Sequence, residues 1–197
     1  MKNPNKEETT KKSSKKVSEF LEKNNLHKKD FAQMIGVTLS YVYNIIDDTI
    51  PFSTRSTTIE RIATVMDVMP EEFEEYVIEE DPIPYNKNLD EIKMNIKKNK
   101  MTNVDFLKLF ERKKRLKMVD ILRGVEPLPI NYEELKNIKD ILNINDKNFY
   151  NLWSNILTDY LEAGGFDKEK NKILLNKMLS AAKDCFNATD LDKCNIS

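Results

Sequence analysis

The amino-acid sequence predicts an all-α protein, and three observations support this fold class. The 197 residues include only four glycines, and the helix-forming residues Leu, Lys, Glu, Met and Ala are plentiful. Apolar residues recur at the i, i+3, i+4 spacing of an amphipathic helix along most of the chain. The pattern of apolar positions then repeats about 75 residues later. We therefore expect two tandem copies of a five-helix domain, followed by a C-terminal helical hairpin.

The composition argues against membrane and secreted proteins. Apolar residues make up 40% of the chain and charged residues 33%, which is ordinary for a soluble helical protein. No apolar run approaches the roughly 18 residues that span a bilayer, and the basic N-terminus has no apolar core behind it, so we expect no membrane segment and no secretory signal. Cys185 and Cys194 are expected to be reduced thiols in the cytoplasm.

Residue types that carry enzymatic chemistry are scarce. His27 is the sole histidine, so no Ser/His/Asp set can be assembled, and with two distant cysteines no zinc-ligand spacing is present. No glycine-rich phosphate loop appears either. The sequence therefore predicts a protein that is not an enzyme and that needs no cofactor or metal.

The N-terminal segment differs sharply from the domain that follows it. Residues 1–16 carry six lysines and two glutamates and lack apolar residues beyond Met1, so we expect a disordered basic arm. The arm is either a solvated tail or a source of phosphate contacts to a nucleic acid. The first domain is expected over residues 17–76, because helical apolar spacing begins at Val17.

Residues 26–46 contain two short helices joined by a tight turn at Gly36-Val37. Apolar residues lie at helical spacing on both sides of this turn, so the pair buries one face and leaves the outer face of its second helix free. A loop that contains a proline leads to a fourth helix, which Thr57 or Thr58 can cap. Pro70 is expected to start a fifth, short helix.

A second copy follows the first along the chain. Residues 77–88 contain two prolines among mixed charges and are expected to form a linker, and the second copy occupies residues 89–153. Asp105-Phe106 lies 75 residues after Asp30-Phe31, and one inserted residue near the turn raises the offset to 76. Beyond that insertion, Ile59, Ile62, Met66, Val68 and Phe73 fall on Leu135, Ile138, Leu142, Ile144 and Phe149.

Residues 154–197 are expected to form the helical hairpin. An amphipathic stripe that runs from Tyr150 to Leu161 marks a helix, which Gly164-Gly165 ends. Asp167 can cap the second helix of the hairpin. The apolar stripe either packs on the second copy or forms a homodimer interface.

Four features with fixed spacing occur together in residues 17–76. They are the run from His27-Lys28-Lys29-Asp30-Phe31-Ala32 to Gly36-Val37-Thr38, the pattern Thr38-x-Ser40-x-Val42-x-x-Ile45, a loop with a proline, and the pattern Ile59-x-x-Ile62-Ala63-x-x-Met66-x-Val68 before Glu71-Glu72-Phe73. Together they resemble the Cro/lambda-repressor-like helix-turn-helix family, also called the xenobiotic-response-element type. This resemblance implies a compact five-helix domain that binds double-stranded DNA, commonly as a dimer on a palindromic operator.

The resemblance also implies which residues contact DNA. Lys28 would contact a phosphate, Thr38 would cap the recognition helix and touch the DNA backbone, and Arg55 would reach a phosphate or the minor groove. The residues that would face base edges in the major groove are Leu39, Ser40, Tyr43 and Asn44.

Cations are scarce near the first recognition helix and abundant in the second copy. The first helix has no Lys or Arg, whereas residues 97–123 carry ten basic and three acidic residues. The run ERKKRLK, residues 111–117, lies at the turn and the start of the equivalent helix, with Glu111 in the place of Gly36. The run is either a solvated helix face or a contact surface for phosphates and guanine edges. In the second case the contacting residues are Lys113, Lys114, Arg115 and Lys117.

Two classes of function remain. The leading hypothesis is a sequence-specific, repressor-like transcriptional regulator, in which the first copy discriminates bases while the second copy and the N-terminal arm hold phosphates. The alternative is a protein-protein interaction module that uses helix-turn-helix folds as docking surfaces without binding DNA.

Overall fold

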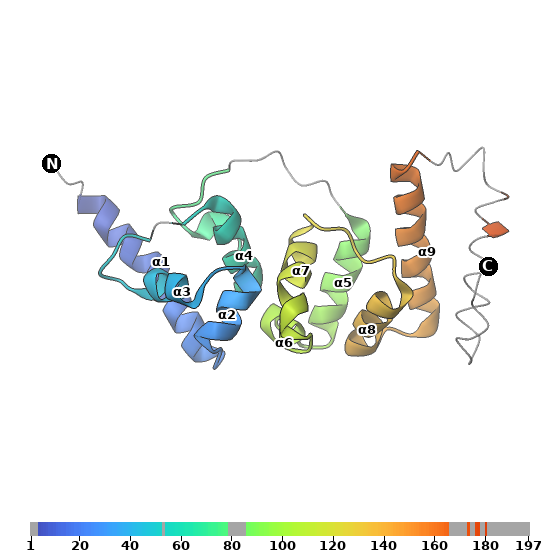
Figure 1. The fold of residues 1–197 in the computed structure, drawn as a ribbon, viewed down its shortest axis with the longest axis horizontal. Coiled ribbons are helices and arrows are strands. Elements are labelled where there is room, and N and C mark those ends of the chain that lie inside the picture. The colour runs from blue at the N-terminus through green and yellow to red at the C-terminus, as the bar shows by residue number, and fades with distance from the viewer. Residues whose placement is uncertain are drawn as a thin grey trace. The chain divides into compact units, whose positions relative to one another are not determined.

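The computed structural model describes residues 4–52, 54–78 and 86–165, together with the isolated positions 173, 176, 177 and 180. Over these residues the chain forms nine α-helices and one short 3-10 helix, with no strand (Figure 1), so the all-α fold class is confirmed. None of the described helices is long and apolar enough to cross a membrane. The helices belong to two compact units, residues 1–127 and 128–197.

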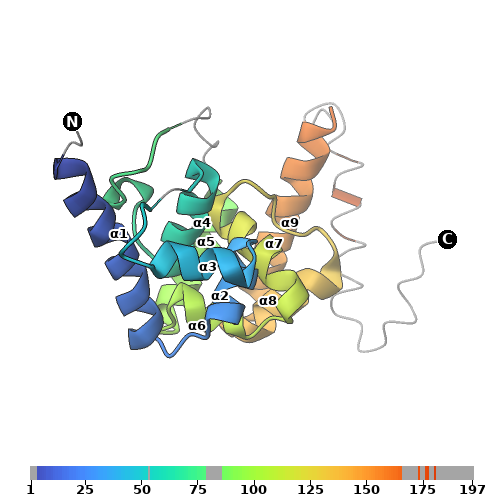
Figure 2. The same ribbon diagram turned by 60° about the vertical axis from the view of Figure 1, so that its left-hand side comes forward.

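The first unit begins with the helices predicted for the first copy. Helix α3 packs against α1 and α2, and α4 packs against α2 and against the 3-10 helix η1 (Figures 1 and 2). The predicted fifth helix is only this 3-10 turn. Phe73 is the one buried side chain of residues 70–76, so little burial is available to stabilise further helical turns. The elements are α1 (Pro4–Lys23), α2 (Lys28–Ile35), α3 (Leu39–Ile46), α4 (Ser56–Met66) and η1 (Pro70–Glu72).

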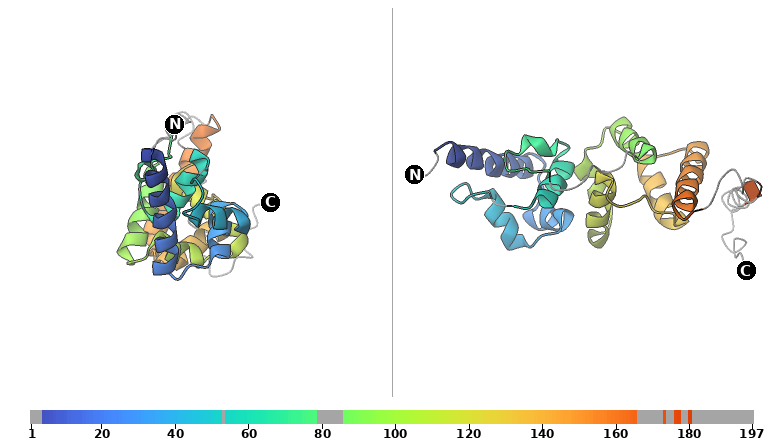
Figure 3. Two further views of the ribbon diagram at one scale, coloured as in Figure 1. Left: turned by 90° about the vertical axis from the view of Figure 1, so that its left-hand side faces the viewer. Right: turned by 90° about the horizontal axis from the view of Figure 1, so that it is seen from above.

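The N-terminal arm differs from the prediction. Helix α1 begins at Pro4, so residues 4–16 are helical rather than disordered, and the first turns extend beyond the other helices of the unit (Figure 3). The Ser13 hydroxyl donates a 2.7 Å hydrogen bond to Glu75 Oε2, and Lys16 pairs with Glu72. The acidic segment after α4 therefore stabilises the basic arm, a long-range contact that local composition does not reveal.

The same unit continues with the first three helices of the second copy, α5 (Lys87–Lys98), α6 (Asn103–Lys108) and α7 (Arg112–Arg123). Helix α7 contacts α5 and α6, and it also packs against α2 and α4 of the first copy (Figure 1). The boundary between the compact units consequently lies after Pro127, and not in the predicted linker at residues 77–88, of which the structure describes 77, 78 and 86–88.

Every α-helix of the first unit contributes to its apolar core. The core side chains of both copies are excluded from water, and close packing of this kind fixes the rotation of each helix about its own axis. The largest fully buried side chains are Phe31, Met34, Ile35, Ile59, Ile62, Phe73, Ile92, Ile96, Phe106, Leu107 and Ile121.

The second unit contains α8 (Tyr132–Leu142) and α9 (Asp146–Ala163). The Tyr132 ring lies edge-on to the rings of Phe149 and Trp153, and Trp153 Nε1 donates a 3.2 Å hydrogen bond to the Ile130 carbonyl. Helix α9 continues across the predicted boundary between residues 153 and 154, because its buried stripe has no break there. Most of the predicted second helix of the hairpin lies outside the described residues; its isolated positions 173, 176, 177 and 180 are helical.

Backbone features repeat at the offsets found in the sequence. Helices α4 and α8 begin and end 76 residues apart. Asn25 and Lys100, 75 residues apart, both adopt positive φ angles, as do Asp67 and Asn143, 76 residues apart. Two left-handed glycines are not repeated: Gly36 has no left-handed counterpart in the turn between α6 and α7, and Gly124 has none at Asp48. The repeat in the sequence is therefore accompanied by a repeat in backbone conformation. The two copies differ at the turn before α3 and α7.

Candidate nucleic-acid interface

The turn between α2 and α3 fixes the orientation of α3. Gly36 takes the left-handed conformation, with φ 72° and ψ 34°, which glycine adopts without steric cost. Thr38 then caps α3 by accepting a 3.2 Å hydrogen bond from the Tyr41 amide. Val42 and Ile45 are buried, so the opposite side of α3 must face outward.

The outward face of α3 carries the residues that the sequence placed there. Leu39 is 40% exposed and Tyr43 is 54% exposed, and Thr38, Ser40 and Asn44 are exposed as well. Figure 2 shows α3 beside α1 on the near side of its unit. The structure thus brings the predicted α3 residues together on one accessible surface.

A groove of about 630 Å³ lies beside this surface. It is lined by the end of α1, the start of α2, Leu39 and Tyr43 of α3, and Arg112 at the start of α7. Lys28 Nζ lies 5.5 Å from the centroid of the Tyr43 ring, a cation-π contact. The groove lining holds three cations, Lys28, Lys29 and Arg112, and two carboxylates, Glu22 and Asp30. The groove is therefore slightly basic, whereas α3 itself carries no charged residue.

The far end of α3 is acidic. Asp47 accepts hydrogen bonds from the hydroxyl and the backbone amide of Thr49, at 2.6 and 2.9 Å. These bonds lower the pKa of Asp47, because they stabilise its carboxylate form. Arg55 is exposed at the N-cap of α4, beyond this carboxylate in the chain. The electrostatic gradient along α3 therefore favours an anion near its N-terminus.

The equivalent face of α7 is not exposed. An offset of 76 places Leu39, Ser40, Tyr43 and Asn44 on Arg115, Leu116, Val119 and Asp120. Val119 is fully buried, whereas Tyr43 at the equivalent position of α3 is 54% exposed. A Cβ atom added to Gly36 would lie 3.0 Å from a Leu116 methyl group, so Leu116 packs directly on the α2–α3 turn.

Ion pairs join α7 to α4. Arg61 binds both carboxylate oxygens of Asp120, at 2.9 and 3.0 Å, a bidentate geometry that favours strong pairing. Arg123 donates to the same carboxylate at 2.8 Å and to Glu60. The Tyr76 hydroxyl completes the cluster by donating a 3.0 Å hydrogen bond to Glu60. Burial is the main cause that raises the pKa of Tyr76, and the hydrogen bond to the Glu60 carboxylate raises it further.

A second set of ion pairs joins α7 to α2. Arg115 Nη1 lies 3.0 Å from Asp30, and Arg112 Nε lies 3.2 Å from the same oxygen. Arg115 also donates to the carbonyls of Phe110 and Lys108, and its side chain is only 11% exposed. The predicted DNA contact Arg115 is therefore turned inward, while Arg112, at 59% exposure, lies open to solvent.

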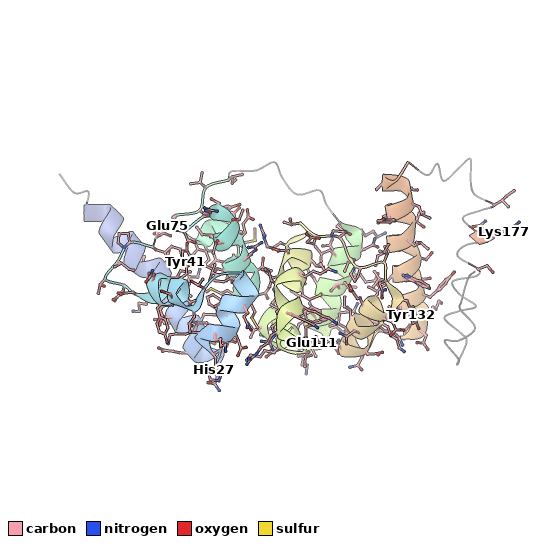
Figure 4. All side chains as sticks on the ribbon, viewed as in Figure 1. His27, Tyr41, Glu75, Glu111, Tyr132 and Lys177 are labelled. Carbon is pink, nitrogen blue, oxygen red and sulfur yellow. The ribbon has the colours of Figure 1, made fainter. Side chains whose placement is uncertain are left out.

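The remaining predicted contacts of the second copy, Lys113, Lys114 and Lys117, are exposed. Lys113 lies 3.2 Å from Glu111, and this pairing lowers the pKa of Glu111. His27 and Glu111, which precede α2 and α7, lie toward the same end of the first unit (Figure 4). The basic starts of α2 and α7 thus adjoin one another, as the contact of Arg112 with Asp30 requires.

Sequence reasoning missed Arg112 and Arg61. Arg112 belongs to the basic run, but no periodicity indicates that it would reach a groove beside α3 rather than a surface of its own copy. Arg61 lies between apolar residues of α4, and nothing in the neighbouring sequence indicates that it pairs with Asp120, 59 residues away. Both roles follow from the docking of α7, which is a tertiary contact.

Comparison with models of protein families, with curated proteins and with solved structures found no match. Within the described part of the chain, no group of His, Cys, Asp and Glu side chains has the arrangement of a metal site.

Proposed function

We propose that this protein is a sequence-specific DNA-binding transcriptional regulator with α3 as its recognition helix. In this proposal the two sets of helices are tandem Cro/lambda-repressor-like helix-turn-helix copies, and only the first reads bases. The observation that supports it best is the exposed polar face of α3 beside the groove that holds Lys28, Lys29 and Arg112.

The chemistry of α3 suits a major groove. The Asn44 amide can pair in a bidentate way with adenine, and the Ser40 hydroxyl can donate or accept. Leu39 and Tyr43 offer apolar contact to thymine methyl groups. Thr38 at the N-cap and Arg55 beyond the helix complete the surface with contacts to the DNA backbone.

Phosphate contacts come from both copies. Lys28 and Lys29 belong to α2, and Arg112 belongs to α7 but lines the same groove. Asp30 is engaged by Arg112 and Arg115, so its charge repels phosphate less than it would in an isolated first copy. Lys113 and Lys114 extend the basic edge. Arg115 contributes indirectly, because it holds α7 in place.

A titration of the full chain tests the proposal. Sites are first selected from a random pool of duplex DNA, and binding to the selected duplex is then followed by fluorescence anisotropy between 50 and about 200 mM salt. We expect log Kd to rise with log salt, by roughly one unit of slope for each phosphate contact. The proposal fails if no salt-dependent binding is seen or if the pool yields no preferred sequence.

Variants assign the roles of individual residues. Ser40→Ala and Asn44→Ala should each cost about 1–3 kcal/mol on the preferred sequence and little on random DNA. Arg112→Glu should weaken binding to both duplexes and reduce the salt dependence. Lys87→Glu, an exposed charge reversal at the start of α5, is the matched control and should have a smaller effect.

A protein-docking function is the second candidate, and one observation favours it. The α7 face that corresponds to the α3 surface already packs on protein, through Leu116, Asp120 and Arg115. A docking surface on α3 would depend on Leu39 and Tyr43 and would leave DNA unbound. The anisotropy titration separates the two candidates, since only the first predicts salt-dependent binding to duplex DNA.

A further inference from the structure

A second cavity, of about 640 Å³, lies within the first unit. Its walls come from both copies, with α4 and η1 on one side and α5, α6 and α7 on the other. It shares no lining residue with the groove beside α3. Its volume falls within the range of about 300–1,000 Å³ that is typical of small-molecule sites.

The cavity lining carries three carboxylates and three cations, but only some of these charges are paired with each other. Glu60 is held by Arg123 and Tyr76, and Glu72 is held by Lys16 and the Met69 amide. Lys93 and Lys97 make no ion pair with any described residue. Asp67 is the remaining carboxylate in the lining. The unpaired charges of the lining are therefore two ammonium groups and one carboxylate, which leaves the lysines available to an anion.

The cavity also has an apolar wall. Six apolar residues line it, and Met69 is 64% exposed, although Met is usually buried. A flexible thioether side chain adapts to ligands of irregular shape. The apolar lining residues are Val68, Met69, Pro70, Ile96, Met101 and Leu122.

Arg123 belongs to the cavity lining and is nearly buried. Its side chain is 6% exposed, and its Nη1 and Nη2 atoms donate to Asp120 and Glu60. The buried Nε–H group has no acceptor among the described residues, which is unusual for a buried polar group. An anionic group that enters past Lys93 and Lys97 would bring acceptor oxygens toward this guanidinium.

We propose that this cavity binds a small organic anion, one whose acidic group contacts Lys93 and Lys97 and whose apolar body packs on Met69, Met101 and Leu122. The ligand bridges the two copies, because the two lysines belong to α5 and Met69 adjoins η1. Binding consequently stabilises the docking of the second copy on the first. The proposal concerns a site separate from the α3 surface and does not require that surface to bind DNA.

The test uses 8-anilinonaphthalene-1-sulfonate as the probe, since it joins a sulfonate to an apolar aromatic body and fluoresces in apolar surroundings. Titration of the full chain should show saturable binding with one probe per chain and a rise in the melting temperature. N-phenyl-1-naphthylamine, which lacks the sulfonate, should bind at least about tenfold more weakly, because it gains nothing from the lysines. Equal affinities for the two probes would overturn the proposed charge recognition.

Two charge reversals locate the site. The double variant Lys93→Glu/Lys97→Glu should weaken sulfonate binding at least about tenfold and leave the binding of the neutral probe unchanged. Lys98→Glu, on the same helix but outside the lining, should leave both unchanged. Circular dichroism confirms that each variant is folded. Undiminished sulfonate binding by the double variant, or binding of several probes per chain, would overturn the proposal.

Discussion

Helices α3 and α7 hold equivalent places in the two copies, yet their equivalent faces have opposite environments. On α3 the exposed side chains are Leu39, Ser40, Tyr43 and Asn44. On α7 the corresponding Arg115 and Asp120 are ion-paired to the first copy, Leu116 packs on the α2–α3 turn, and Val119 is buried. Two helices at equivalent positions of the repeat therefore need not share a function, because α7 is covered by the first copy and α3 is open to a partner.

The largest expected contrast comes from Val119→Asp and Tyr43→Asp. Val119 is fully buried, and burial of an unpaired carboxylate should lower the free energy of unfolding by at least ~3 kcal/mol. Tyr43 is 54% exposed, so the same change should alter stability by at most about 0.5 kcal/mol while abolishing DNA binding. Urea denaturation and anisotropy measure the two effects, and similar losses of stability would show that the two faces are equally buried.

Asp120→Ala and Asn44→Ala form the next pair. Loss of Asp120 leaves Arg61 and Arg123 without their shared carboxylate. The cost should be about 2 kcal/mol, less than for a fully buried pair because Arg61 remains 26% exposed. Asn44→Ala should change stability little. A double-mutant cycle of Arg61→Ala with Asp120→Ala should give a coupling energy of about 1 kcal/mol, and a coupling near zero would contradict the docked position of α7.

Gly36→Ala probes the contact between the α2–α3 turn and α7. The left-handed φ of 72° already disfavours alanine, and the new Cβ would lie 3.0 Å from Leu116 Cδ1. We expect a loss of about 1–2 kcal/mol in the free energy of unfolding. Part of this loss should disappear when Gly36→Ala is made together with Leu116→Ala, since the crowding is then relieved. Strictly additive effects would argue against the contact.

The smallest effect concerns Asp30 and Asp105, which lie 75 residues apart. Asp30 pairs with α7, whereas Asp105 closes a capping box with Thr102 at the start of α6. Hydrogen bonds from the hydroxyl and then the amide of Thr102 lower the pKa of Asp105. A lowered folded-state pKa means that Asp105 stabilises the fold above the ordinary value of 3.8 and loses this contribution as the pH falls through the folded-state pKa.

The variant Asp105→Asn should therefore cost about 0.5 kcal/mol at neutral pH. The difference from the parent protein should shrink as the pH falls below about 4, which urea titrations at several pH values can follow. A difference that stays constant down to pH 2 would mean that the carboxylate charge plays no part in the cap.

Local sequence patterns were enough to predict most of the helices and their buried faces. Apolar periodicity identified α2 to α9, and the repeat offset predicted the buried positions from Leu135 to Phe149. The exposed face of α3 followed from Val42 and Ile45, which must point inward. Long-range partners escaped prediction. Arg115 has the pattern of a surface cation, but it pairs with Asp30. Residues 4–16 of α1 have the composition of a disordered segment, but Ser13 and Lys16 bind Glu75 and Glu72.

The most direct test of the account is a chemical-shift titration of the isotope-labelled full chain with its selected DNA duplex. Amide resonances of residues 38–44 on α3 should shift, together with those near Lys28 and Arg112. Amides of residues 115–120 on α7 should stay in place, because that face is covered by the first copy. Shifts in α7 that equal those in α3, or an α3 that does not respond, would contradict the assignment of base recognition to the first copy alone.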